Sequence, residues 1–402
     1  MAPLKSGHAE IFGSELAKGP EYSFSGRKLA PTVDYVAEET PMQSYLNVHL
    51  ALEDLREEAA ASGADGPKVM IVGPADVGKS SLAKILSNYA AKRGRKPVFV
   101  DIDTNEGSVT LPGSLSATAI GKPIDVEDEL GAATSATGTS PIVYYYGYSS
   151  PIEKPKLYSL LTTRLSTLVK RKLSHDDVRT SGLIINTPSQ FVEPGGYDLL
   201  THAIDSFGAN AILVLGHERL YSDLSRRFRD TEGVAVLKLA KSGGVVTRDK
   251  SYRRQLQMQK IKEYFYGTRK HELSPYSNII GFGDVAVRRV GEGTLAPSSA
   301  LPLGMERKLL ETRLVKVEPG DILLHSVLAI SNAVAPEKPA AADAKPLTPE
   351  EESSLVLEAN LAGFVYVSEV DEGKHKMTVL APNPGRLPKR YLLMATLKWM
   401  ES

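Results

Sequence analysis

The sequence predicts an α/β protein with a central doubly wound parallel sheet, a short amino-terminal β domain and a carboxy-terminal β-rich domain. Between residues 40 and 289, short runs of Val, Ile and Leu alternate with longer runs whose apolar residues recur at helical spacing. Strands without polar alternation are typical of parallel sheets that helices cover on both faces. After residue 290 the chain changes to Gly- and Pro-punctuated β-type runs. We therefore expect three domains, over residues 1–39, 40–289 and 290–402.

The elements follow in order from these patterns. Residues 1–39 contain only short apolar pieces, "AEIFGSEL" and "EYSFSGRKLA", and the run "TPMQSYLNVHLALEDLREEAAA" then predicts a helix. Five strands are expected at "KVMIVG", "PVFVDID", "SGLIINT", "NAILVLG" and "VAVLKLA", with amphipathic helices between them. In the last domain, residues 333–352 are rich in Pro, Ala and charge, which predicts a mobile loop.

Composition limits the classes of protein that the chain can belong to. Of its 402 residues, 42% are hydrophobic and 24% are charged, as in ordinary globular proteins. We expect no membrane contact, because no run approaches about 18 consecutive apolar residues and the start lacks a signal-peptide core. The chain has no cysteine, which excludes disulfides and thiolate metal sites. Lys plus Arg and Asp plus Glu both total 48, so any nucleic-acid contact needs a local basic patch.

The stretch "IVGPADVGKSSLAKIL" fits the phosphate-binding pattern G-x-x-x-x-G-K-[ST] through Gly73, Gly78, Lys79 and Ser80. It follows an apolar strand and opens a helix, so that backbone N–H groups and the helix amino terminus point at an anion. Lys79 would reach the terminal phosphates and the Ser80 hydroxyl would hold Mg²⁺. The alternative is a glycine turn with an exposed lysine. The pattern predicts a nucleoside triphosphate, either as a substrate or as a structural ligand.

A magnesium-nucleotide site also needs a carboxylate at the end of a neighbouring strand. "VFVDID" ends at Asp103, with Asp101 two residues earlier on the same face, whereas "LIINT" places Asn186 where many phosphate-loop ATPases have an acid. We favour Asp103 as the metal-facing carboxylate, which could also serve as general base for a hydroxyl nucleophile. The alternative is that both aspartates only solvate a strand end.

A second candidate element is "KSGGVVTRDKSYRRQLQMQKIKEYFYG", where a Gly pair precedes Arg248 and Arg253 and an amphipathic helix. Nucleotide kinases place arginines on a lid at this point of the fold, after the fifth strand. A solvated basic helix face explains the same residues equally well. No guanine-reading N-K-x-D follows a strand, which argues against a signalling GTPase.

Taken together, "AEIFGSEL", "TPMQSYLNVHLALE", "VGPADVGKSSLAKIL", "SLSATAIGKPIDVEDELG", "KSGGVV" and "IKEYFYG" resemble the Clp-type RNA 5′-hydroxyl polynucleotide kinase family. The resemblance covers nearly the whole chain. It implies a phosphate-loop domain between two β domains, and a nuclear role in pre-mRNA 3′-end cleavage and polyadenylation or a role in tRNA splicing. The partners it implies are a Pcf-type scaffold, other subunits of the cleavage and polyadenylation factor, and in some members RNA.

The resemblance also assigns roles by position. ATP and Mg²⁺ are the implied cofactors, and Lys28 would pack on the adenine. Asp103 matches the catalytic, metal-associated aspartate, and Arg248 and Arg253 match the lid arginines, which with Lys79 complete the catalytic set of an active member. The remaining residues that match the phosphate loop are Asp76, Val77, Gly78, Ser80 and Ser81.

Two departures from the family pattern bear on activity. Active members read D-x-G-Q after the second strand, where this chain has Asn105 and Glu106 in place of Gly and Gln, and a new carboxylate beside phosphates adds like charge. Active members also carry T-x-G-[WY], whose aromatic stacks on the RNA end, whereas Thr187 is followed by "PSQ". Losing such a ring costs about 1–3 kcal/mol of base stacking. Phe191, one position later, is the alternative stacking ring.

A third departure concerns the amino-terminal domain. Strands that family members have before "AEIFG" and after "KLA" are missing, so this domain is expected to be incomplete, through splicing or an imperfect gene model. The sequence thus supports two readings of different classes. One is a non-catalytic, ATP-bound structural subunit of the cleavage and polyadenylation machinery, and the other is a working RNA 5′-hydroxyl kinase. A metabolic ATPase or small-molecule kinase is a third reading, and would contradict the resemblance.

Overall fold

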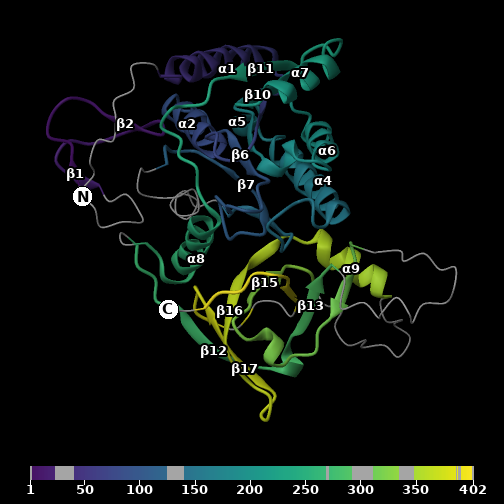
Figure 1. Ribbon diagram of the computed structural model, residues 1–402. Coiled ribbons are helices and arrows are strands. Elements are labelled where there is room, and N and C mark those ends of the chain that lie inside the picture. Colours follow the sequence, from purple (N-terminus) through teal and green to yellow (C-terminus); the bar gives the residue numbers. More distant parts are fainter. Residues whose placement is uncertain are drawn as a thin grey trace. The chain divides into compact units, whose positions relative to one another are not determined.

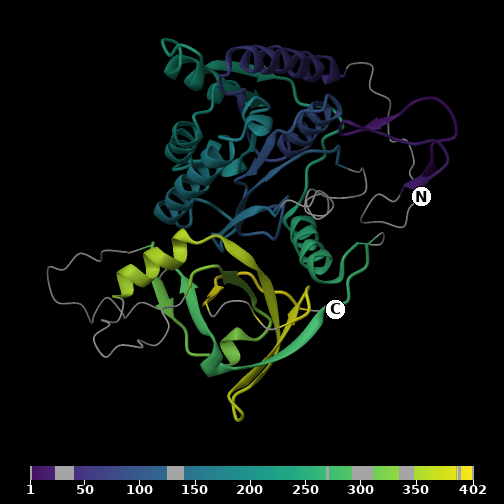
Figure 2. The same cartoon turned by 180° about the vertical axis from the view of Figure 1, so that it is seen from behind.

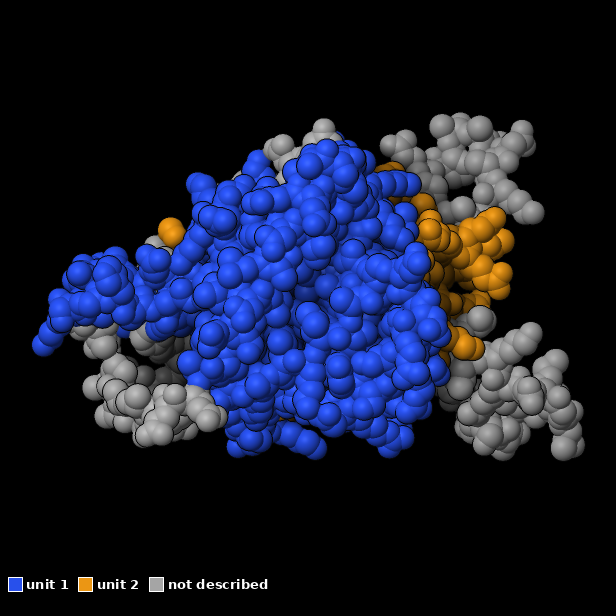
Figure 3. All heavy atoms as spheres, turned by 90° about the horizontal axis from the view of Figure 1, so that it is seen from above, with its two compact units in different colours: residues 1–103, 116–141, 165–250 blue, residues 104–115, 142–164, 251–402 orange. Residues whose placement is uncertain are grey.

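The computed structural model describes residues 2–22, 40–124, 140–268, 271–291, 311–334, 348–385, 387 and 391–400. The chain forms two compact units, which Figure 3 shows in different colours. Unit 1 comprises Met1–Asp103, Ser116–Pro141 and Leu165–Lys250. Unit 2 comprises Thr104–Leu115, Ile142–Arg164 and Ser251–Ser402. The chain therefore passes between the units several times, and each unit is described separately.

The elements have the following bounds. The helices are α1 (Met42–Ser62), α2 (Lys79–Lys92), α4 (Pro155–Lys172), α5 (Asp176–Arg179), α6 (Tyr197–Phe207), α7 (Glu218–Arg227), α8 (Lys250–Tyr266) and α9 (Pro349–Glu358). The strands up to residue 239 are β1 (Ala2–Pro3), β2 (Glu10–Ile11), β3 (Ser14–Glu15), β4 (Glu21–Tyr22), β5 (Lys68–Val72), β6 (Val98–Asp101), β7 (Ser114–Ala119), β8 (Ile142–Tyr145), β9 (Leu183–Asn186), β10 (Ala211–Leu215) and β11 (Ala235–Leu239). The later strands are β12 (Tyr276–Gly281), β13 (Ala286–Val290), β14 (Leu314–Lys316), β15 (Val327–Ser331), β16 (Leu361–Asp371), β17 (Lys376–Ala381) and β18 (Tyr391–Met394).

The predicted doubly wound fold is confirmed in unit 1 (Figure 1). The strand order is β11-β10-β5-β9-β6-β7, and all of these neighbours pair in parallel except β6 and β7. The chain moves in one direction from β5 through α2 to β6, and in the other from β9 through α6 to β10. Because such crossovers are right-handed, α2 and α6 lie on opposite faces. The carboxyl end of β5 therefore lies where the winding reverses, which is where open α/β sheets bind ligands.

Unit 2 contains the predicted carboxy-terminal β-rich sheet, coloured green and yellow in Figures 1 and 2. Its seven strands run in the order β12-β17-β16-β15-β18-β13-β14 around a core that includes Val287, Leu328, Val365 and Val379. Two of these strands, β12 and β13, begin before residue 290, and α9 begins at Pro349 inside the range expected to be a loop. The compact units divide the chain differently from the expected domains 1–39, 40–289 and 290–402, and these domain boundaries stay predictions.

A short hairpin of β2 and β3 packs on α2 within unit 1. Asn88, which is fully buried, donates through Nδ2 to the Phe12 carbonyl at 2.8 Å and accepts from the Ile124 N–H at 2.7 Å. Gly13 has a φ of 81°, and a Cβ on it would lie 2.9 Å from the Asn88 Cβ. The hairpin therefore approaches the helix at a distance that only glycine permits.

Helix α1 is fixed to the sheet by a buried group of charges. Arg56 Nη1 lies 2.6 Å from Glu53 Oε1, and Arg56 Nε donates to the Ser181 carbonyl at 3.0 Å. The other oxygen of Glu53 accepts from Arg95 Nε at 3.0 Å. Burial acts to raise the pKa of Glu53, but the hydrogen bonds from Arg56 and Arg95 outweigh it and hold this pKa below its ordinary value. The carboxylate is therefore a stabilising partner at neutral pH.

Replacing Glu53 with Gln should lower the free energy of unfolding by about 3 kcal/mol at pH 7, because it leaves a buried guanidinium without its carboxylate. Because the folded-state pKa is depressed, this contribution is complete above the unfolded pKa of about 4.3 and is lost as the pH falls below it. In urea unfolding, the difference in free energy of unfolding between wild type and Glu53→Gln should be smaller at pH 3.5 than at pH 7.

The matched control is Asp65→Asn, which breaks a pair of the same i,i+3 spacing with Lys68 at 2.8 Å. The Asp65 side chain is 50% exposed, so its loss should cost at most about 0.5 kcal/mol. Equal losses in the two variants, or a Glu53→Gln difference that does not change with pH, would show that the buried charges do not fix α1.

Candidate nucleotide-binding site

The loop between β5 and α2 has the backbone shape that a phosphate loop requires. A Cβ on Gly73 would lie 2.4 Å from the carbonyl oxygen of Leu215, at the end of the neighbouring strand β10. Gly78, directly before α2, has a φ of 93°, which an L side chain rarely adopts. Both motif glycines are thus needed for the loop to turn tightly onto the amino terminus of α2.

Lys79 is the first residue of α2, and its side chain folds back over the loop. The Nζ group donates to the Pro74 carbonyl at 2.8 Å, and the residue is 7% exposed. Ser80 and Ser81 follow in the first turn of α2 and are half-buried. An ammonium group, helix N–H groups and two hydroxyls therefore gather at one place, and this donor set suits a polyphosphate.

The segment of residues 241–249, between β11 and α8, lies against this loop within unit 1. A Cβ on Gly78 would lie 3.2 Å from Cγ2 of Val245. Arg248 donates from its backbone N–H to Asp76 Oδ2 at 3.0 Å and from Nε to Asp76 Oδ1 at 3.1 Å. Arg248, predicted as a lid arginine, is thus brought to the phosphate loop, where its partner is a carboxylate of the loop itself.

The carboxylates at the strand ends are placed by register. Asp101 on β6 lies opposite Asn186 on β9, which lies opposite Ile71 on β5. Asp101 Oδ1 accepts from the Asp103 N–H and from Asn186 Nδ2, each at 3.1 Å. Both aspartates are buried, and Asn186 Oδ1 has no hydrogen-bond partner among the described residues. Asp101 therefore organises this edge of the sheet and fixes the backbone of Asp103.

Comparison with known protein families gives three matches along the chain. Residues 2–59 match the N-terminal β-sandwich domain of polyadenylation factor, residues 73–267 the P-loop of mRNA cleavage and polyadenylation factor CLP1, and residues 273–401 the pre-mRNA cleavage complex II protein Clp1. The chain belongs to the Clp1 family. Its glycine-lined loop lies within the range that matches the family's P-loop model.

Similar proteins come from several eukaryotes. The mRNA cleavage and polyadenylation factor clp1 of Botryotinia fuckeliana is 40% identical over 423 residues, covering 99% of this chain and 88% of the relative. A CLP1 homolog of Arabidopsis thaliana is 41% identical, covering 99% of this chain and 89% of the relative. The chicken (Gallus gallus) relative, named polyribonucleotide 5′-hydroxyl-kinase Clp1, is 37% identical, covering 99% of this chain and 91% of the relative.

Two solved structures share the fold. One is the wild-type Clp1p–Pcf11p complex, with a TM-score of 0.81, 26% identity and coverage of 100% of this chain and 93% of that chain. The other describes an extended Pcf11p–Clp1p interface and the basis for ATP loss in a glycine-to-arginine mutant. It has a TM-score of 0.82 and 28% identity, and covers 99% of this chain and 93% of that chain.

Two of the predicted Clp1-type site residues, Lys28 and Arg253, are not among the described residues of unit 1. Lys28 falls outside the described residues. Arg253 lies on the part of α8 that belongs to unit 2. Asn105 and Glu106 also belong to unit 2, in its segment Thr104–Leu115. Within unit 2, Gln257 Nε2 on α8 donates to both the carbonyl and Oδ1 of Asn105, at 2.8 and 3.1 Å. Asn105, one of the two residues that depart from D-x-G-Q, is thus hydrogen-bonded to the helix that carries Arg253.

The suggestion that Phe191 replaces the missing RNA-stacking ring is wrong. Phe191 lies in the 3₁₀ turn Ser189–Val192 and is fully buried, so its ring has no face on the surface. Thr187, the first residue of the family clasp, donates its hydroxyl to the Ile71 carbonyl at 2.7 Å. What remains of this motif therefore contributes to the sheet.

The donor set fits the nucleotide that the family implies. Lys79, Ser80 and Ser81 suit its phosphates, while the Ser80 hydroxyl and an Asp103 carboxylate are hard oxygen ligands that suit Mg²⁺. The described residues contain no group of three or more acidic or His side chains that could hold a metal ion. A nucleotide-bound Mg²⁺ takes only one or two protein oxygens besides phosphates and water, so this arrangement is compatible with it.

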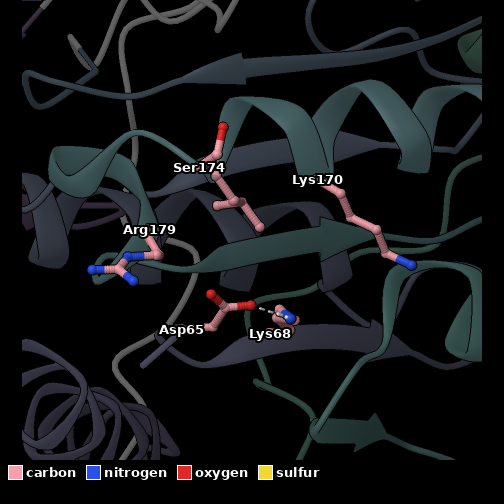
Figure 4. Close-up of a pocket in the computed structure, with 6 residues that line it drawn as sticks. Asp65, Lys68, Lys170, Ser174 and Arg179 are labelled. Carbon is pink, nitrogen blue, oxygen red and sulfur yellow. Dashed lines mark hydrogen bonds and ion pairs between the residues drawn. The ribbon is translucent and has the colours of Figure 1, made fainter. Parts of the chain in front are cut away.

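A separate hollow of about 490 Å³ lies at the opposite end of β5 (Figure 4). Lys68 in its wall is the first residue of β5, whereas the phosphate loop follows the last. Lys170 and Arg179 also line it, and Lys68 pairs there with Asp65 at 2.8 Å. Its place in the sheet separates this hollow from the candidate site.

Replacing Asn186 with Asp should destabilise the protein by about 3 kcal/mol at pH 8, because burial and the neighbouring Asp101 raise the pKa of the new carboxyl by about two units. The new carboxyl would lose its proton near pH 4 in the unfolded chain and near pH 6 in the folded protein, so the destabilisation should stay constant from pH 8 to about pH 6 and then shrink by about 1.4 kcal/mol per pH unit as the pH falls toward 4. Urea unfolding in EDTA from pH 5 to pH 8 measures both effects.

Asn210→Asp is the control, since Asn210 Oδ1 accepts the Lys68 N–H at 2.7 Å and a carboxylate keeps that bond. This substitution should lower the free energy of unfolding by less than about 1 kcal/mol at both pH 5 and pH 8. If Asn186→Asp is as stable as the wild type at pH 8, this edge of the sheet tolerates a second carboxylate, contrary to the geometry.

Proposed function

We propose that this chain is an ATP-binding, non-catalytic structural subunit of the nuclear machinery for pre-mRNA 3′-end cleavage and polyadenylation. The observation that carries the proposal is a contrast. Lys79 folds back over a loop whose two glycines permit a tight turn, whereas Thr187 is followed by "PSQ" in place of the family's aromatic residue, and Phe191 is buried. A complete phosphate site without an RNA-stacking ring favours retention of nucleotide over transfer to RNA.

The relatives support the biological setting. Several are named as mRNA cleavage and polyadenylation factors, and the solved Clp1p structures contain Pcf11p. We therefore propose a Pcf11-type scaffold as the partner, together with other subunits of the factor, and a nuclear location, where that processing takes place. No helix in the described ranges is long and apolar enough to span a membrane.

In this proposal each residue of the site binds or orients. Lys79 and the N–H groups at the start of α2 hold the phosphates, Ser80 and Asp103 hold Mg²⁺, and Lys28 packs on the adenine. The N–H of Asp103 is itself fixed by Asp101. Bound ATP supplies stability, because a ligand that binds only the native state adds about 4 kcal/mol at a thousandfold excess over its Kd. This role needs no turnover.

An RNA 5′-hydroxyl kinase is the second candidate. It is supported by the presence of Lys79, Ser80, Asp103, Arg248 and Arg253, and by the 37% identity to a relative named as such a kinase. In that case Lys79 and the two arginines would stabilise the transferring phosphoryl group, and Asp103 would accept the proton of the RNA hydroxyl.

We expect the purified protein to carry about one ATP per chain and to transfer no label from γ-labelled ATP to a 5′-hydroxyl RNA. Lys79→Ala should lose the nucleotide and melt several degrees lower, because an ammonium that contacts the phosphates is removed. Nucleotide extraction, thermal melting and the transfer assay measure these three outcomes.

Lys92→Ala, at the far end of α2, is the control that removes a lysine from the same helix away from the loop. It should keep the nucleotide. Label that appears on the RNA with wild type and disappears with Lys79→Ala would establish the kinase instead. A chain that purifies without adenine nucleotide, and whose melting temperature does not respond to added ATP, would contradict both candidates.

A further inference from the structure

The pairing of Asp76 with Arg248 joins two segments that are 172 residues apart in the chain. Both carboxylate oxygens take part, one with the backbone N–H of Arg248 and one with its Nε. The side chain of Asp76 is 6% exposed and that of Arg248 is 30% exposed. One residue thus holds both the main chain and the side chain of segment 241–249, and neither bond involves the terminal Nη groups.

The charge of Asp76 calls for an explanation. Its φ is 54°, in the left-handed region that Asp and Asn both tolerate. Asparagine would therefore suit the backbone as well as aspartate does. A negative side chain inside a phosphate loop repels the phosphates unless a cation compensates it. A carboxylate at this position is therefore expected to pair with a cation, and in the structure it pairs with Arg248.

A second contact supports the same arrangement. Val245 lies over Gly78, where an added Cβ would come within 3.2 Å of its Cγ2. Residues 242–245 form a turn, closed by the Val245 N–H and the Ser242 carbonyl at 3.2 Å. Segment 241–249 therefore covers the loop at two points, Gly78 and Asp76.

We propose that Asp76 is a positioning residue that holds Arg248, and with it segment 241–249, on the phosphate loop. Arg248 then promotes nucleotide binding by neutralising Asp76 and covering the loop, instead of contacting a transferring γ-phosphate. The inference rests on the proposed nucleotide site, and it gives this arginine a role that a non-catalytic subunit needs as much as a kinase does.

A double-mutant cycle tests the proposal. Affinities for ATP and for ADP are measured by calorimetry on wild type, Asp76→Asn, Arg248→Ala and the double variant. Arg248→Ala alone should weaken both nucleotides about tenfold, because an uncompensated carboxylate then faces the phosphates. In the Asp76→Asn background the same change should weaken them less than about threefold. Equal factors in the two backgrounds, or a loss for ATP about tenfold greater than for ADP, would overturn the proposal.

Hydrogen exchange on the nucleotide-free protein gives a readout that does not depend on binding. Asp76→Asn and Arg248→Ala should each speed exchange of the amides in segment 241–249, and unchanged exchange would overturn the positioning role. If the wild type binds neither nucleotide, the proposed function fails, but the exchange result still decides whether Asp76 holds the segment.

A surface pair in the same unit provides the matched control. Arg227 Nη2 and Asp205 Oδ2 lie 3.6 Å apart, with side chains 41% and 65% exposed. The cycle of Arg227→Ala and Asp205→Asn should leave both nucleotide affinities and the exchange of segment 241–249 unchanged. A change there equal to that at Asp76 and Arg248 would show a general charge effect and count against the proposal.

Discussion

The close approach of the Gly73 backbone to the Leu215 carbonyl is the constraint on which the candidate site depends. A side chain at Gly73 would occupy the space that the end of β10 already fills. One residue further along the chain, a Cβ added to Gly216 would lie 3.0 Å from Cγ1 of Val77 in the loop. Both contacts are with the end of β10, so the loop is packed closely against this strand end, and its N–H groups are held at the start of α2 whatever the ligand.

Close packing also explains why a neutral polar group lies beside a charged one at this edge of the sheet. Register places Asp101 beside Asn186, and an amide there donates a hydrogen bond that a second carboxylate could not supply. In a closely packed sheet the two side chains have no room to separate. An asparagine at this strand end is thus compatible with Asp101, which in turn fixes the backbone at Asp103.

Much of the fold was predictable from the sequence because its signals are local. The apolar strands, the helix periods and the P-loop pattern each lie within about twenty residues, and the structure confirms the α/β core they predict. The signal for helix α9 was also local, but the Pro- and charge-rich composition of residues 333–352 led to the prediction of a loop there. Thr348 and Glu351 form a capping box around Pro349 at the helix start.

The features that the sequence did not reveal depend on contacts between distant residues. Asp76 and Arg248 were each predicted at the site, one in the loop and one on a lid, but nothing in either motif indicated that they pair. Phe191 illustrates the converse error. Its position in the chain suggested an RNA-stacking ring, whereas its burial is set by packing that a motif does not encode.

The chain between β11 and the end of α8 runs from one compact unit into the other and is held by contacts in each unit. Arg248 is held on the phosphate loop of unit 1. The next residues form α8, which in unit 2 is held by Phe265 stacked on Trp399 at 5.9 Å and by Gln257 bonded to Asn105. Only two residues separate Arg248 from the first residue of unit 2. Under the proposed function, a nucleotide that fixes the phosphate loop also fixes Arg248 and segment 241–249, and this effect needs no transfer of its phosphate.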